Sequence, residues 1–272
     1  MNWIKNSFLG MYNGECSKDA YLEKPNHDWF MQYGRQEGIE SKWKEIISLN
    51  KTDAMQEIDN LIQTMEDNSE ANGFFGQKDN VYISQMSGFR LDDRSIYYDF
   101  FANLRKYQQL ATSAGKVNVD GQIIFRAIKD TVEGYLGKSK NDMAARIARN
   151  MLTEADFNDS LPSISRQKGK GTGVCTEMSA IAHNLWLLAG KASHFISTHD
   201  CQLKSDDIYA RDGHTFCIVQ YEGKYRMFDM AYDNFGLMEG NPIDTIKNGQ
   251  ALRFGQDEQN VYISNESAMS RI

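Results

Sequence analysis

The spacing of apolar residues changes near residue 160, and this change constrains the fold more than any other feature of the sequence. Over 52–65, as in other early segments, apolar residues recur three or four positions apart, which is the spacing of a helix with one buried face. Later in the chain, apolar and polar residues alternate over 192–196, 214–221 and 224–230, which predicts strands. A helical part followed by a mixed part predicts an α+β fold.

The same patterns place individual elements and suggest two regions. We expect a helical N-terminal region over residues 1–115 and an α+β domain over residues 116–272. A short apolar run over 81–83 predicts a strand within the first region. The expected helices cover 39–49, a segment from Thr52 or Asp53 through Met65, a segment capped by Asp92 or Asp93 that continues through Tyr107, 120–136 with Gly137 at its end, 142–152 and 174–189.

Charge, apolar run length and cysteine content exclude several classes of protein. The 272 residues carry a net charge of −7 at pH 7, which disfavours a broad phosphate-binding surface, so we expect no nucleic-acid partner. No apolar run approaches the ~20 residues that span a bilayer, and the N-terminus lacks the pattern of a secretory signal. Four scattered cysteines are typical of reduced thiols. We therefore expect no membrane span, and either a cytoplasmic location or export without a signal peptide, including into a host cell.

A cysteine at the start of a predicted helix is the first candidate for chemistry. Cys175 follows the segment 166–173, which combines three glycines with three cations and predicts an exposed, bendable loop. It precedes an apolar helix face that ends at Gly190. The amide groups and the dipole at a helix N-terminus stabilise a thiolate, the form of cysteine that attacks carbonyl carbons. Cys175 is therefore a candidate nucleophile, and the alternative is a buried structural cysteine.

A histidine and an aspartate on a predicted hairpin can complete this site. If residues 222–223 form a two-residue loop, Phe216 lies opposite Asp229. Because side chains alternate along a strand, His214 shares the face of Phe216, and His214 and Asp229 become diagonal neighbours. A carboxylate at that position holds an imidazole in one tautomer. An odd loop length would separate the two side chains, so the prediction depends on the register.

Together these motifs resemble a known superfamily. They are G-V-C-T-E at a helix start, H-T-F-C-I-V on one strand and Y-E-G-K-Y-R-M-F-D across a hairpin. Over about 169–234 the chain resembles the transglutaminase-like, papain-related superfamily of cysteine enzymes, in which such motifs carry a catalytic triad. The 39 residues from Cys175 to His214 and the 15 from His214 to Asp229 are typical of it. The resemblance implies that these three residues form the triad. It also implies that residues 116–272 are a papain-like catalytic domain, with the cysteine helix packed on an antiparallel sheet.

The resemblance also implies a reaction. A thioester on the cysteine would carry the acyl group of a protein-bound glutamine, so the first hypothesis is a deamidase or transglutaminase similar to bacterial glutamine deamidase effectors. The backbone N–H of Cys175 and the side chain of Gln167 are the candidates for binding the oxyanion. A cysteine protease or peptidase on the same triad is the alternative, and a non-catalytic binding protein that retains the fold is another. We expect no cofactor.

The remaining polar residues receive structural interpretations. A zinc site is not expected, because Cys217 lies three residues from His214 on one strand and should point to the opposite face. We expect Glu177, in the first helical turn, to complement the helix dipole, and His183 to be a solvated surface residue. The residues considered as zinc ligands are His194, His199, Cys201, His214 and Cys217.

Overall fold

The described part of the chain is built from helices and antiparallel strands, which confirms the α+β class. The computed structural model describes residues 31–34, 42–67, 81–83, 88–137, 163–198, 214–221, 223–231 and 234–247. Its helices are α3 (Lys42–Ser48), α4 (Lys51–Asp67), α6 (Ser95–Ser113), α7 (Asp120–Leu136), the 3₁₀ helix η3 (Ile164–Gln167), α9 (Cys175–Leu188) and α10 (Pro242–Lys247). Its strands are β1 (Met31–Gly34), β2 (Val81–Ile83), β3 (Gly88–Arg90), β4 (Ser193–Thr198), β5 (His214–Tyr221), β6 (Lys224–Asp229) and β7 (Asn234–Leu237).

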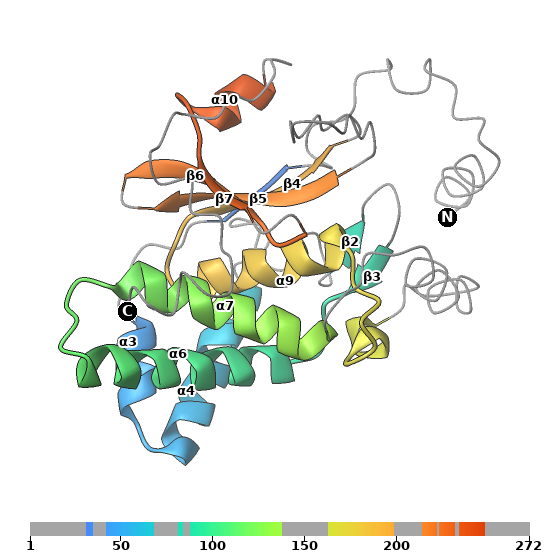
Figure 1. Ribbon diagram of the computed structural model, residues 1–272. Coiled ribbons are helices and arrows are strands. Elements are labelled where there is room, and N and C mark those ends of the chain that lie inside the picture. Colours follow the sequence, from blue (N-terminus) through green and yellow to red (C-terminus); the bar gives the residue numbers. More distant parts are fainter. Residues whose placement is uncertain are drawn as a thin grey trace, which may run out of the picture.

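Helices cover both faces of the main sheet (Figure 1). Helix α9 packs against β4 and β5 on one side and against α7 on the other, and α6 packs against α7 beyond it. On the opposite face of the sheet, Ile243 of α10 joins a small cluster with Ile218 and Met227. Within the described ranges, no helix is long and apolar enough to cross a membrane. The helix predicted over 142–152 lies outside the described residues.

The main sheet fixes the register on which the candidate site depends. Its strand order is β1-β4-β5-β6-β7, and all neighbouring strands are antiparallel. Cys217 of β5 pairs with Phe228 of β6, and the same register, continued by one residue, places Asp229 opposite Phe216. Gly223 in the connection has φ +73°, a conformation that favours glycine. The predicted two-residue loop and its register are confirmed.

Helix α9 is buried on all sides, which differs from the prediction of a single apolar face. Its polar side chains are buried as well and are hydrogen-bonded. Asn184 Nδ2 donates to Tyr97 Oη (3.3 Å) on the side of α6, and His183 Nδ1 lies 3.0 Å from Ser193 Oγ on the side of β4. The expectation that His183 is solvated is wrong, because β4 covers its side of the helix. A helix sandwiched between two layers has no solvent-facing side.

One hydrophobic core joins the helical layers to the sheet. Leu104 of α6 and Ile128 of α7 are fully buried in the same cluster as Trp186 of α9 and Phe228 of β6. The rings of Trp186 and Phe228 pack edge to face with their centroids 5.5 Å apart, a preferred arrangement of aromatic pairs. Residues on both sides of position 115 therefore contribute to this core, and the division of the chain at that position stays a prediction.

A side-chain cap sets the start of α4, and an aspartate lies one residue before the N-cap position of α6. Helix α4 begins one residue after Asn50, whose Oδ1 accepts the backbone N–H of Asp53 (3.1 Å). Asn50 is therefore the cap, and the expectation of Thr52 or Asp53 is wrong by two or three positions. Before α6, Asp93 Oδ1 accepts the backbone N–H of Ser95 (2.9 Å). The N-cap residue is Arg94, which makes no side-chain capping bond, so the predicted cap at Asp92 or Asp93 is wrong by one or two positions.

The glycine-rich segment before α9 is held against the end of α7. The backbone N–H groups of Gly169 and Gly171 donate to the carbonyl oxygens of Tyr135 and Leu136, both at 2.7 Å. Gly137 has φ +81°, and a Cβ atom there would lie 2.9 Å from the backbone nitrogen of Gly171. The residues around Gly169 are exposed, as predicted. However, the segment is hydrogen-bonded in place rather than freely bendable, and its glycines allow close backbone approach.

We expect Gly137→Ala to lower the free energy of unfolding by about 1–3 kcal/mol, because alanine would adopt a positive φ and would crowd Gly171. Gly134→Ala is the matched control in the same helix. It is exposed and its new Cβ meets nothing within 4 Å, so it should raise the free energy of unfolding by about 0.5–1 kcal/mol. Urea unfolding followed by circular dichroism measures both. Equal effects of the two substitutions would contradict the contact between α7 and the loop.

Candidate active site

Cys175 is the first residue of α9, at the end of the helix where backbone N–H groups point outward. The residue is partly exposed and is not in a disulfide. Val174 at the N-cap position is extended, with φ −115° and ψ −171°, so the helical conformation begins at the cysteine itself. The positive end of the helix dipole favours a negative charge on the sulfur. The structure thus places Cys175 where the sequence predicts it.

The first turn of α9 touches the first residues of β5. Thr176 Oγ1 lies 3.3 Å from Thr215 Oγ1, and Ser179 Oγ donates to the carbonyl oxygen of Thr215 (2.9 Å). Thr176 directly follows Cys175, and Thr215 directly follows His214. Cys175 and His214 are 39 positions apart in sequence. The contact between the residues that follow them brings their backbones near each other.

Asp229 is a buried carboxylate at the end of β6. Only 1% of its surface is exposed, and its Oδ1 accepts the backbone N–H of Ala231 (3.0 Å). Phe216 and Met227 belong to the cluster on the side of the sheet away from α9, and regular alternation assigns Asp229 to that side as well. A buried carboxylate needs polar partners, because its desolvation is costly.

The three predicted triad residues lie at one end of the sheet. Strand β5 begins at His214, and its antiparallel neighbour β6 ends at Asp229. Helix α9 begins at Cys175 on the face that carries Thr215. Because Asp229 belongs to the other face, any contact among the sulfur, imidazole and carboxylate would have to form around the ends of the strands. The side chain of His214 lies outside the described residues, so contact within the triad stays a prediction.

Gln167 and Glu177 form a buried contact at the start of α9. Gln167 Nε2 donates to Glu177 Oε1 (3.1 Å), and the backbone N–H of Val174 donates to Glu177 Oε2 (3.1 Å). Glu177 is 0% and Gln167 is 3% exposed. Glu177 therefore complements the helix N-terminus, as predicted, and also binds the predicted oxyanion residue. The spacing of an N-cap residue and a glutamate three positions later predicts the contact of Glu177 with Val174. No local pattern predicts the contact of Glu177 with Gln167.

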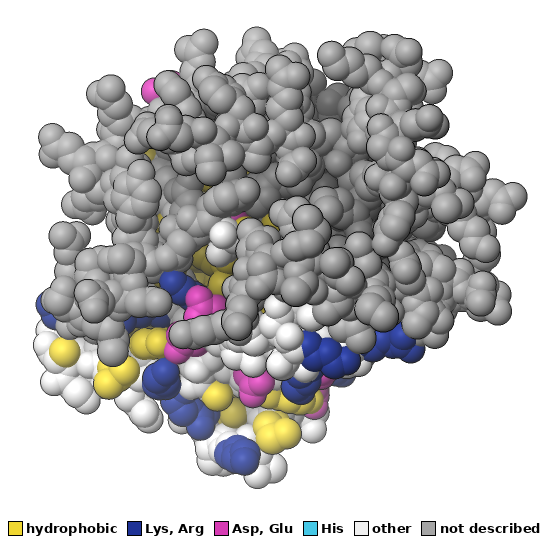
Figure 2. Space-filling model, turned by 45° about the vertical axis from the view of Figure 1, so that its right-hand side comes forward, with side chains coloured by type: hydrophobic (Ala, Val, Ile, Leu, Met, Phe, Trp, Pro, Cys, Tyr) yellow, Lys and Arg dark blue, Asp and Glu magenta, His cyan; other side chains and the backbone are white. Residues whose placement is uncertain are grey.

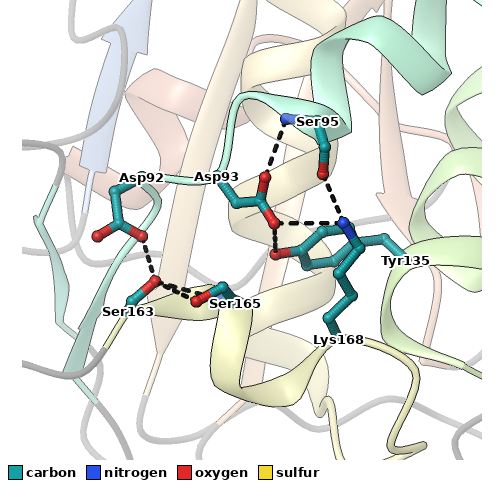
Figure 3. A network of polar contacts seen from close by, with 7 residues as sticks. All are labelled: Asp92, Asp93, Ser95, Tyr135, Ser163, Ser165 and Lys168. Carbon is teal, nitrogen blue, oxygen red and sulfur yellow. Dashed lines mark hydrogen bonds and ion pairs between the residues drawn. The ribbon is translucent and has the colours of Figure 1, made fainter.

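A polar network anchors the loop after η3 through Lys168 (Figure 3). Asp93 accepts hydrogen bonds from the backbone N–H of Ser95 (2.9 Å) and from Tyr135 Oη (2.8 Å). Lys168 Nζ donates to Ser95 Oγ (2.8 Å) and lies 3.5 Å from Asp93. Burial raises the pKa of Asp93, but the hydrogen bonds of Ser95 and Tyr135 and the charge of Lys168 outweigh it and lower that pKa below its usual value. The network joins the start of α6, the end of α7 and the loop.

Cys217 is buried, whereas Cys175 is partly exposed. The Cys217 side chain is fully buried on β5, and its Sγ donates to the carbonyl oxygen of Ser179 (3.2 Å). Burial raises the pKa of the Cys217 thiol far above its usual range, and the charge of Asp229 raises it further. A thiol in this environment is chemically inert.

The other histidines and cysteines considered for metal binding do not form a cluster in the described ranges. His194 is buried on β4, and its backbone pairs with Ile218 of β5. His199 and Cys201 lie outside the described residues. Within those residues, no group of three or more His, Cys, Asp or Glu side chains is arranged to hold a metal ion.

Charges of both signs lie side by side on the helical layers. On the described part of the surface in Figure 2, basic and acidic side chains are interspersed. Ion pairs join Lys106 to Asp130 (3.1 Å) and Arg94 to Glu66 (2.8 Å). Ion pairs that remain accessible to solvent contribute little stability individually.

No protein-family model, no curated protein and no solved structure matches this chain. The resemblance to cysteine enzymes therefore depends on the motifs of the sequence itself. The structural observation relevant to this resemblance is the arrangement of the start of α9, the start of β5 and the end of β6.

The lowered pKa of Asp93 predicts how stability depends on pH. Its stabilising contribution is present above the unfolded pKa of about 3.9 and is lost as pH falls through the lower folded pKa. We expect Asp93→Asn to cost about 1 kcal/mol at pH 7, and this cost should shrink between about pH 5 and pH 3. Tyr135→Phe, which removes one donor to Asp93, should reduce the pH-dependent part of wild-type stability. Urea unfolding at several pH values measures these differences, and a cost independent of pH would contradict the role of Asp93.

Proposed function

We propose that the protein is a transglutaminase-like, papain-related thiol enzyme with Cys175, His214 and Asp229 as its catalytic triad. The observation that carries the proposal is the contact of Thr176 with Thr215, which sets the start of α9 beside the start of β5. The register of β5 and β6 adds the end of β6 to the same place. A helix-borne cysteine, a strand-borne histidine and an aspartate on the next strand are the arrangement that the superfamily uses.

The proposed reaction is acyl transfer from a protein-bound glutamine through a thioester. The sulfur of Cys175 attacks the carbonyl carbon of the side-chain amide, and the C–N bond breaks as His214 gives a proton to the departing ammonia. Water, or an amine, then attacks the thioester while His214 accepts its proton. Water gives a deamidated glutamate and an amine gives a transamidated product, and in both cases the thiol is regenerated. Asp229 orients His214 and stabilises its charged form.

The surroundings of Cys175 suit this role. The helix N-terminus favours the thiolate, and the backbone N–H of Cys175 is a candidate donor to the oxyanion of the tetrahedral intermediate. Gln167, whose amide lies at the first turn of α9 through its bond to Glu177, is the second candidate. These groups are provided by one helix start and the loop before it, which the network around Asp93 holds in place.

Selective alkylation tests the nucleophile without any substrate. We expect iodoacetamide at about pH 6 to modify Cys175 at least about tenfold faster than Cys217, because Cys175 is a partly exposed residue at a helix N-terminus and Cys217 is buried with a raised pKa. Mass spectrometry of the peptides from the folded protein measures the rates. Urea-unfolded protein is the control, in which the difference should disappear. Modification of Cys175 no faster than a free cysteine would favour a non-catalytic binding protein.

A mass change of the substrate distinguishes the candidate reactions. Incubation with a cell lysate should add about 1 Da to specific glutamine-containing peptides, since deamidation replaces an amide by an acid. Cys175→Ala should abolish this change, and Asp229→Asn should slow it at least about 100-fold. Asp99→Asn on the exposed side of α6 is the matched control and should have no effect. Cleaved peptides without a mass gain would instead indicate a cysteine protease.

A further inference from the structure

The carboxamide of Gln167 is buried with part of its hydrogen-bonding capacity unused. Its Nε2 donates one bond, to Glu177 Oε1 at 3.1 Å. Its Oε1 has no partner within the described part of the chain, although the residue is only 3% exposed. A buried carbonyl oxygen without a partner costs about 1–3 kcal/mol, a cost that an apolar side chain of the same size would avoid. A buried polar atom without a partner in a native structure calls for a specific explanation, and a catalytic role is one such explanation.

Glu177 decides the orientation of this carboxamide. A carboxylate accepts hydrogen bonds and cannot donate them, so it binds Nε2 and repels Oε1. Glu177 cannot easily turn away, because it is 0% exposed and its second oxygen accepts the N–H of Val174 (3.1 Å). Gln167 is thus held with one N–H on Glu177. Its second N–H lies in the same amide plane, about 120° away.

We infer that Glu177 is a positioning residue that holds Gln167 so that its second Nε2 N–H donates to the oxyanion formed when Cys175 attacks a carbonyl group. The inference rests on the function proposed above and adds to it a residue that acts through Gln167. Glu177 bridges the backbone immediately before Cys175 and the Gln167 amide, so one side chain ties the donor to the start of α9. Preorganised donors of this kind contribute about 10²–10³-fold each to the rate.

Two reagents distinguish the effect of the oxyanion donor from the reactivity of the Cys175 thiol. With p-nitrophenyl acetate, the sulfur of Cys175 attacks the acetyl carbon, an oxyanion forms, the C–O bond breaks and p-nitrophenolate leaves. With iodoacetamide, the sulfur displaces iodide from a CH₂ group and no oxyanion forms. We expect Glu177→Gln to slow acylation about 100-fold and to change alkylation by less than about threefold. Glu45→Gln is the matched control: Glu45 also lies in the first turn of a helix but is exposed, and its substitution should change neither rate.

Gln167→Met provides a second comparison if Glu177→Gln does not unfold cooperatively in urea. It removes the donor and keeps a side chain of similar size, and we expect the same selective loss of acylation. The double variant should lose no more than the more affected single variant, because both residues act through one donor. Parallel slowing of both reagents, or no change in either, would overturn the inference.

The outcomes for the proposed function and for this inference are distinguishable. A wild-type protein that is acylated by the ester but modifies no glutamine contradicts the proposed reaction alone, and the comparison of the two reagents remains valid. Turnover of glutamine with equal effects on both reagents contradicts the role of Glu177 alone. A wild-type Cys175 that neither reagent modifies faster than free cysteine contradicts both.

Discussion

The burial of helix α9 between the sheet and the helical layers is the constraint on which the rest of the structure depends. A helix in this position must satisfy its polar side chains internally, and Ser179, His183 and Asn184 each have a specific partner on a neighbouring element. These hydrogen bonds fix the position of α9 along the sheet, which hydrophobic contact alone would not do. The start of the helix, and with it Cys175, is therefore fixed relative to β5.

The loop before α9 is also held in place, by hydrogen bonds to the end of α7. Backbone hydrogen bonds from Gly169 and Gly171 to the end of α7, both 2.7 Å, require close approach of two backbones, which glycine permits. Lys168 joins the same loop to Asp93 at the start of α6. Three elements distant in sequence thus converge on the few residues that precede the cysteine, and a reactive group benefits from such a rigid support.

Several buried polar groups at this end of the molecule are costly for stability. Asp229, Glu177 and Gln167 are nearly inaccessible to water, and the last has an oxygen without a partner in the described ranges. Apolar residues would fill the same space at lower cost. Departures from the rules of a stable core are expected at functional sites, and Glu177 and Gln167 lie around the first turn of α9, where the sequence motifs also point.

The short elements β1, β3, β7, η3 and α10 escape prediction from the sequence, because too few residues are present to show a period. The sequence by itself determined the longer helices, the strands β2, β4, β5 and β6 and the pairing of β5 with β6, because apolar periodicity and a two-residue turn are local properties that few residues encode. It also identified Cys175 at a helix start. Only the tertiary structure decided that α9 is buried on both sides, that His183 contacts Ser193 and that Glu177 binds Gln167. Each of these depends on which surfaces the layers present to one another, and the periodicity of a single segment carries no information about its partners.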